Sequence, residues 1–335
     1  MKRKAILSAY SALILAALLL AVFTFNQVNA LFNLLETLHP FAGLTFLLIF
    51  AATTLLFLAA AARFFWSPNK PGLPDHESSK EMGAYITYMT GRMRTHPMHP
   101  DPRKKEKDLR WVRTNLKLAE VDALNTTKQL ATKNFFVGAF AQNTSYGTTT
   151  SLLNNIRVLW TIYSIHNREQ HLMEFISLVR AVYGCLPLSD FRKEEIPAHI
   201  QPIIQSAFSN TLSSLLPAGN LLTPFFLNLF LAGATNTYLT CLSGIIAMHQ
   251  SQIMTEEDKK EIVAQSIFEA SFMLKEIVRE CNPVLSVTIS KAVKKAGIES
   301  LDTMPSPSLD SGLAQGIVSH LASSLKSIIK ETAKE

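Results

Sequence analysis

The chain has 335 residues, of which 48% are hydrophobic and 17% charged, and its formal net charge is +6. This composition is apolar enough for a packed core and excludes an intrinsically disordered chain. Three widely spaced cysteines also exclude a disulfide-rich scaffold.

Two apolar runs near the N-terminus predict a transmembrane hairpin. Residues 5–25 carry no charge, and residues 41–63 carry none before Arg63. Because about 20 apolar residues cross roughly 30 Å of hydrocarbon as a helix, each run is long enough. We therefore expect two transmembrane helices within residues 1–66, at about 5–25 and 41–63, joined by a short loop. A cleaved signal peptide is disfavoured because the first run is too long and a second follows it.

The charges beside these runs predict their orientation. Lys2, Arg3 and Lys4 precede the first run, and Arg63 closes the second. The connecting loop, residues 26–40, contains no lysine or arginine. Since basic residues stay on the cytoplasmic side, both termini are expected in the cytoplasm.

Residues 67–102 have the composition of a linker, with six prolines. Asp101 followed by Pro102 is typical of a helix start, a capping residue before a first-turn proline. We expect a helical domain over residues 103–252 and C-terminal amphipathic helices over residues 253–335.

Basic residues are concentrated where this linker meets the helical domain. Between Arg92 and Arg113 there are eight basic and three acidic side chains. Near a cytoplasmic leaflet each basic residue contributes about 1 kcal/mol of attraction to anionic lipid. A solvated helix face is the alternative, whereas a nucleic-acid site is disfavoured because no reader motif is present. The candidate lipid-binding residues are Arg92, Arg94, Arg103, Lys104, Lys105 and Lys107.

The central region predicts an all-α fold. Alternation typical of strands is absent, and no Asp, Glu, Lys or Arg occurs between Glu195 and Glu256. Four prolines, Pro197, Pro202, Pro217 and Pro224, are expected to divide this stretch into short helices. Residues 223–248 could span a membrane, but polar residues near their middle would lack partners in lipid. We therefore predict that residues 196–252 form the buried core of a cytoplasmic domain, with a third span left open.

Short motifs in this region resemble a known family. They are Val158–Trp160, then Val182–Gly184 with Pro187, and GATNTYLT at residues 233–240 ahead of Gly244. Their order resembles the YcjF-like inner-membrane family, which shares a domain of unknown function with certain GTPases and GTPase-associated proteins. The similarity covers roughly residues 1–250.

This resemblance implies a bacterial inner-membrane protein that engages a P-loop GTPase, in envelope stress. The chain departs from the family pattern by about ten inserted residues between Trp160 and Tyr183, and by Leu186 at a position often basic.

Small and polar residues at helical spacing are the candidates for close helix packing or partner contact. Glycine admits a neighbouring helix, and Asn and Thr can hydrogen-bond across the gap. These residues are Tyr183, Gly184, Gly233, Asn236, Thr240 and Gly244.

The tail predicts two amphipathic helices. Thr255 and Asp258 form a capping pair, Asn282 and Pro283 are expected to end the first helix, and residues 303–309 form a linker. The last helix either packs on its own domain or docks on a partner or membrane, and homo-oligomer formation stays open.

Taken together, the sequence favours a membrane-anchored, non-enzymatic scaffold or regulator. No Walker loop or nucleophile elbow is present, and we expect no catalytic residue, cofactor or metal site. The alternative is a membrane-active or transport protein that uses residues 196–255 in the bilayer.

Overall fold

A computed structural model describes residues 2–65, 70–140, 145–186, 195–215 and 223–295. These residues are helical apart from loops, turns and one isolated pair, Met93 with Asn167, in which two extended residues meet. The expected all-α fold is confirmed. Contacts divide the chain into two compact units, residues 1–67 and 68–335, which are described separately.

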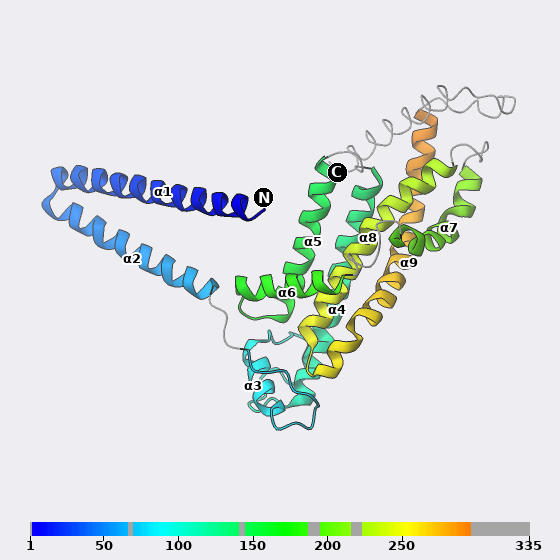
Figure 1. The fold of residues 1–335 in the computed structure, drawn as a ribbon, viewed down its shortest axis with the longest axis horizontal. Helices are drawn as coiled ribbons and strands as arrows, with labels where there is room; N and C mark the ends of the chain where they lie inside the picture. Colours follow the sequence, from blue (N-terminus) through cyan, green and yellow to red (C-terminus); the bar gives the residue numbers. More distant parts are fainter. Residues whose placement is uncertain (1, 66–69, 141–144, 187–194, 216–222, 296–335) are drawn as a thin grey trace. The chain divides into compact units, whose positions relative to one another are not determined.

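The first unit is a hairpin of α1 (Lys2–Leu38) and α2 (Pro40–Phe65) (Figure 1). His39 makes the turn, because its ring Nδ1 accepts the Phe41 N–H at 3.2 Å and its carbonyl accepts the Ala42 N–H at 2.9 Å. Pro40 follows as the first helical residue, where no N–H is needed. Most of the connection expected over residues 26–40 is helical and extends the first apolar helix, since α1 continues to Leu38.

The side chains of this hairpin are apolar and exposed. Leu20 is 69% exposed and Phe57 73% exposed, and both lie in helices long enough to cross a membrane. A water-soluble protein would bury such surfaces, because exposed apolar area is costly in water. The chain is therefore membrane-associated through its first unit.

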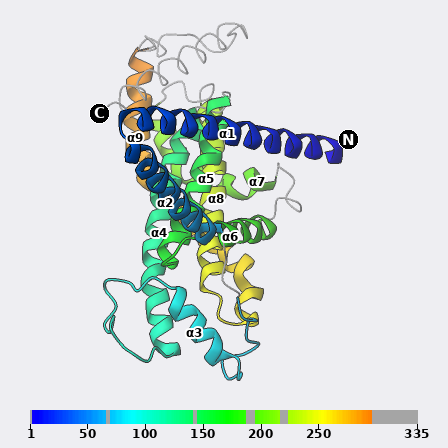
Figure 2. The same cartoon turned by 90° about the vertical axis from the view of Figure 1, so that its left-hand side faces the viewer.

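The second unit is a helical bundle with α8 at its centre (Figures 1 and 2). The bundle's long helices lie roughly alongside one another, while α6 lies across them. Its helices are α3 (Met82–Arg92), α4 (Leu109–Phe140), α5 (Ser145–His166), α6 (Leu172–Cys185), α7 (Glu195–Leu215), α8 (Thr223–Gln252) and α9 (Glu256–Lys295).

Helix α8 packs against α4, α5, α6, α7 and α9. In the described part of the chain, three helices are long and apolar enough to cross a membrane, and α8 is the third. Its apolar stretch, Phe230–Gln252, is 72% buried by protein, unlike the hairpin. The covering helices carry charge outside, as where Lys128 of α4 bonds Glu276 and Glu280 of α9. The burial predicted for residues 196–252 is thus confirmed for this part of them.

A close helix crossing fixes α8 in the bundle. A methyl group added to Gly244 would lie 2.6 Å from the Thr127 side chain of α4 and 3.0 Å from Val158 of α5. Side chains do not approach so closely, so only glycine fits at the observed helix separation.

A second hydrophobic cluster closes one end of the bundle, where α3 lies (Figure 2). Tyr85 and Met89 of α3 pack there with Trp111 of α4, and the Tyr85 hydroxyl donates to the Ile253 carbonyl at 2.9 Å. Residues 70–102, expected as a linker, therefore belong to the folded domain.

Helix α4 begins at Leu109 and not at Pro102. The Asp108 carboxylate accepts the Trp111 N–H at 2.8 Å, so it caps the helix in place of Asp101. The other predicted cap is confirmed, because Thr255 and Asp258 bond each other's backbone N–H at 2.9 and 3.3 Å.

Internal prolines do not end the helices as expected. Pro202 lies inside α7 and Pro283 inside α9, which continues to Lys295. At that point Asn282 of α9 donates to the Ala207 carbonyl of α7 at 3.0 Å, so tertiary packing holds the helix. The predicted linker at 303–309 and the last helix lie outside the described residues.

We predict that Gly244→Ala destabilises the domain by about 1–3 kcal/mol, because the methyl group overpacks the crossing with Thr127. Gly184→Ala is the matched control: nothing lies within 4 Å of a methyl group there. Alanine should be neutral or stabilise α6 by up to about 1 kcal/mol. Thermal unfolding followed by circular dichroism measures both, and equal midpoints for the two variants would contradict the crossing.

Candidate functional site

The predicted contact residues on α8 face the inside of the bundle. Thr240 is fully buried, and its hydroxyl accepts a bond from Asn134 Nδ2 of α4 at 2.7 Å and donates one to Asn155 Oδ1 of α5 at 2.7 Å. Asn154 Nδ2 donates to Asn134 Oδ1 at 2.5 Å and extends this network. The buried polar groups thus satisfy one another across three helices.

Gly233, Asn236 and Gly244 lie on the same helix. Gly233 and Gly244 are buried, and the Asn236 carbonyl lies 2.8 Å from the Thr240 hydroxyl, whose one hydrogen it shares with Asn155. Of the two uses expected for this pattern, helix packing is the one that the geometry supports.

Tyr183 and Gly184 lie elsewhere, in the last turn of α6, and both are exposed. The helix continues one residue beyond Gly184, to Cys185. Phe175 and Val182, on the opposite side of α6, are buried in the core. Tyr183, 39% exposed, shares the outer surface with Met173 and Ile176, which are 53% and 40% exposed.

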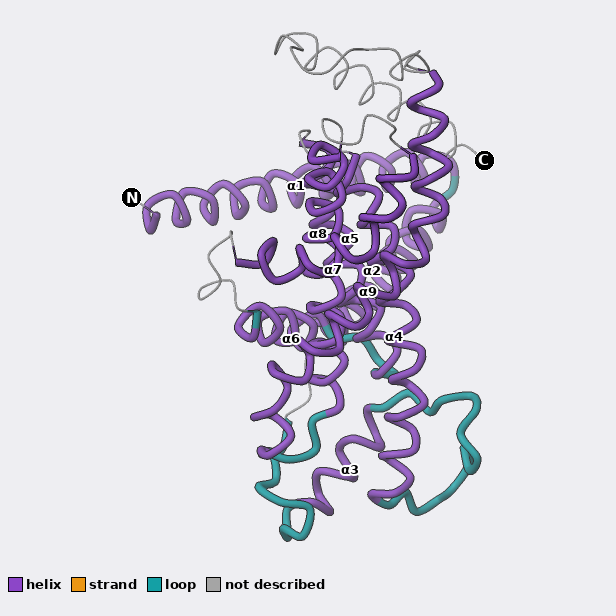
Figure 3. Tube along the Cα trace, turned by 90° about the vertical axis from the view of Figure 1, so that its right-hand side faces the viewer, coloured by secondary structure: helices purple, strands orange, loops and turns teal. Residues whose placement is uncertain are grey.

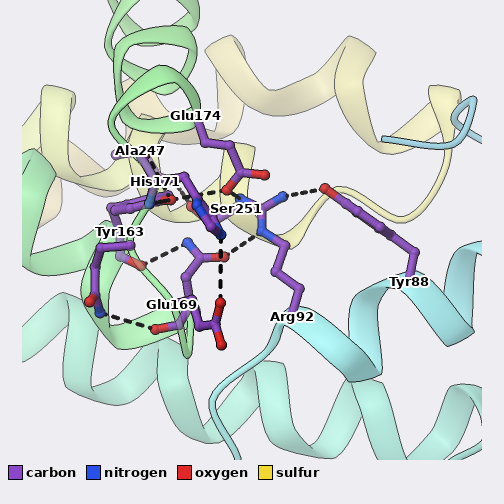
Figure 4. Close-up of polar contacts among 10 residues, drawn as sticks. Tyr88, Arg92, Tyr163, Glu169, His171, Glu174, Ala247 and Ser251 are labelled. Carbon is purple, nitrogen blue, oxygen red and sulfur yellow. Dashed lines mark hydrogen bonds and ion pairs between the residues drawn. The ribbon is translucent and has the colours of Figure 1, made fainter. Parts of the chain in front are cut away.

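A polar cluster that the sequence did not predict surrounds Arg92 (Figure 4). Arg92 Nε donates to Asn167 Oδ1 at 2.6 Å, and Nη1 donates to the Tyr88 hydroxyl at 2.9 Å. Its Nη2 forms an ion pair with Glu174 Oε2 at 3.1 Å, and the Glu174 side chain is only 9% exposed. The guanidinium therefore joins α3 to the start of α6 and to the turn before it.

Glu174 has a second donor in this cluster. The Tyr163 hydroxyl lies 3.0 Å from Glu174 Oε2 and itself accepts the His171 N–H at 2.9 Å. Burial raises the pKa of Tyr163 to about 12, so its hydroxyl stays protonated and can donate at neutral pH. The carboxylate is thereby held by one cation and one neutral donor.

Backbone bonds run beside these side chains. The Arg94 N–H donates to the His166 carbonyl at 3.2 Å, and the Arg168 N–H donates to the Arg92 carbonyl at 2.8 Å. The cluster thus fastens the chain after α3 to the turn between α5 and α6. The Arg92 guanidinium links these segments through Asn167, Tyr88 and Glu174, so it is not free for the lipid contact expected of it.

The other candidate lipid-binding residues lie on the loop between α3 and α4 (Figure 3). Arg94, Arg103 and Lys105 are exposed. Lys104 bonds Asp108 Oδ2 at 2.9 Å, and the Lys107 ammonium lies 4.3 Å from the centre of the Trp111 ring. Farther along, Arg113 of α4 pairs with Glu77.

In the part of the chain that the structure describes, no group of three or more His, Cys, Asp or Glu side chains could hold a metal ion. Comparisons with protein-family models, curated proteins and solved structures returned no match. The resemblance to the YcjF-like family therefore stays a prediction.

We predict that Arg92→Ala destabilises the domain by about 2–3 kcal/mol, because it leaves the largely buried Glu174 carboxylate without its cation. Lys259→Ala is the control, since it removes an exposed pair with Glu256 and should cost less than about 0.5 kcal/mol. Urea unfolding measures both changes. Equal losses would show that the Arg92 cluster contributes no more than a surface ion pair.

Proposed function

We propose that this protein is a membrane-anchored, non-enzymatic scaffold or regulator whose helical domain binds a protein partner. One observation carries the proposal: an exposed apolar hairpin precedes a separate domain whose own apolar helix, α8, is covered by other helices, of which α4 and α9 carry ion pairs at the surface. The hairpin supplies attachment, and the domain supplies a folded surface in water.

The resemblance names the partner class as a P-loop GTPase. The sequence itself contains no Walker loop, so any nucleotide chemistry would belong to that partner. The candidate contact surface is the outer side of α6, which we call the α6 face: Met173, Ile176, Tyr183 and Gly184. Aromatic and methionine side chains are favoured in protein interfaces.

The resemblance implies the bacterial inner membrane, and the charge distribution supports an orientation with both termini in the cytoplasm. Lys2, Arg3 and Lys4 precede α1, and Arg63 closes α2, whereas the turn at His39 has only Glu36 nearby as a charged residue. Basic flanks are retained in the cytoplasm.

Burial of α8 weighs against the alternative, a transport or membrane-active protein that uses residues 196–255 in lipid. With 72% of its apolar stretch buried by protein, α8 has little surface left for lipid. Its polar Thr237 and Thr240 also find partners inside the bundle, on α4 and α5.

We predict that a photo-crosslinking amino acid placed at Tyr183 captures a P-loop GTPase in native bacterial membranes. The α6 face is exposed, and an aromatic photo-crosslinking residue has nearly the shape of the Tyr183 side chain that it replaces. The control position is Lys275, an exposed residue of α9 that lies off this face. Mass spectrometry identifies the crosslinked protein. Recovery of no nucleotide-binding protein from position 183, or the same proteins from both positions, would contradict the proposal.

A further inference from the structure

The loop between α3 and α4 is held rigidly from its inner side. We call residues 94–107 the basic loop. Trp111, 3% exposed, donates its Nε1–H to the Asp101 carbonyl at 2.9 Å, and its ring packs on His99 with centroids 4.6 Å apart. Asn115, 1% exposed, accepts the His96 N–H at 2.7 Å and donates to the Arg94 carbonyl at 3.0 Å. Buried side chains of α4 thus fix the loop at several points.

Turns within the loop are also fixed. His96 Nδ1 accepts the Met98 N–H at 3.1 Å, and His99 Nδ1 accepts the Asp101 N–H at 3.0 Å. Between these turns Met98 is 76% exposed. These bonds hold the loop in a conformation that leaves the Met98 side chain in water, outside the buried hydrophobic cluster to which Trp111 belongs.

Positive charge surrounds this exposed methionine along the chain. The basic loop contains five basic side chains and two acidic ones, Asp101 and Glu106. In the described residues, no ion pair is recorded for Arg103 or Lys105, whereas Lys104 pairs with Asp108 just beyond the loop. Arg103 and Lys105 are therefore available to an external anion.

An apolar side chain amid basic residues on a rigid loop suits the interface of an anionic membrane. The apolar group enters the headgroup boundary while the basic groups attract lipid phosphates and carboxylates. Single-stranded nucleic acid suits it less well, because the one tryptophan of this region, Trp111, is buried and offers no face for base stacking.

A short segment of chain also connects the domain to the membrane hairpin. Helix α2 ends at Phe65 and α3 begins at Met82, so 16 residues of chain, 66–81, connect the last helix of the hairpin to the first helix of the domain. Linkage by so short a segment raises the effective concentration of membrane surface around the domain, so even a weak lipid site can be occupied.

We propose that the basic loop binds anionic lipid headgroups of the membrane that the hairpin spans, with Met98 entering the interface. This inference rests on the membrane anchoring in the proposed function. Each basic residue near an anionic surface strengthens binding about fivefold, so reversing two of them should weaken it by well over tenfold. Salt should also release the loop, because headgroup attraction is screened.

The test places an environment-sensitive fluorophore on Met98→Cys in the full-length chain. Cys185→Ser removes the partly exposed cysteine, and the buried Cys241 and Cys281 stay unlabelled. The chain is reconstituted into nanodiscs of phosphatidylcholine, with or without phosphatidylglycerol. We expect blue-shifted emission only with phosphatidylglycerol, reversed by high salt and lost in the variant with Arg103→Glu and Lys105→Glu.

The matched control reverses two exposed lysines of α9, with Lys260→Glu and Lys275→Glu, and should keep the blue shift. Identical emission in both lipids, or equal loss in the control variant, would overturn the proposal. Resistance of the chain to alkaline extraction reports the hairpin separately. If alkaline treatment extracts the chain from the membrane, the hairpin is not a membrane anchor. The fluorophore at position 98 would then be measured with added vesicles, and its emission would still show whether the basic loop binds lipid.

Discussion

The covering of α8 is the constraint on which the helical domain depends. A thirty-residue helix without a single charge cannot remain in water, so it must enter a membrane or be enclosed by protein. Here five other helices enclose it. Enclosure obliges its polar side chains to find partners, and Thr240 does so between Asn134 and Asn155. It also obliges the helices to approach closely, which Gly244 permits beside Thr127.

This packing changes where a partner could bind. The pattern from Gly233 to Gly244 was a candidate for partner contact, but its residues pack against other helices of the bundle. The two candidate surfaces for other molecules are therefore elsewhere: the α6 face, and the basic loop held by Trp111 and Asn115. Arg92 belongs to neither surface, because its ion pair with Glu174 fastens the chain between them.

Features governed by local sequence could be predicted. Long uncharged runs indicated the hairpin, the lack of strand alternation indicated the all-α fold, and Thr255 with Asp258 indicated a helix start. The polar residues amid α8 indicated its burial, because they would be costly in lipid.

What the sequence did not predict depends on distant or competing partners. The Arg92 cluster joins residues about 75 positions apart, so no local pattern marks it. Asp101 and Asp108 are both good caps, but Trp111 bonds the carbonyl of the first and leaves the second to begin α4. Pro283 was expected to end a helix, yet packing on α7 through Asn282 carries α9 onward.

The most direct test of this account asks on which side of the membrane the chain ends. Fluorescent proteins that fold only in the cytoplasm would be fused before Met1 and, separately, after Glu335. A hairpin with α8 inside a domain predicts fluorescence from both fusions, because the chain crosses the membrane twice. Fluorescence from the N-terminal fusion alone would show that α8 crosses the membrane and would contradict the account.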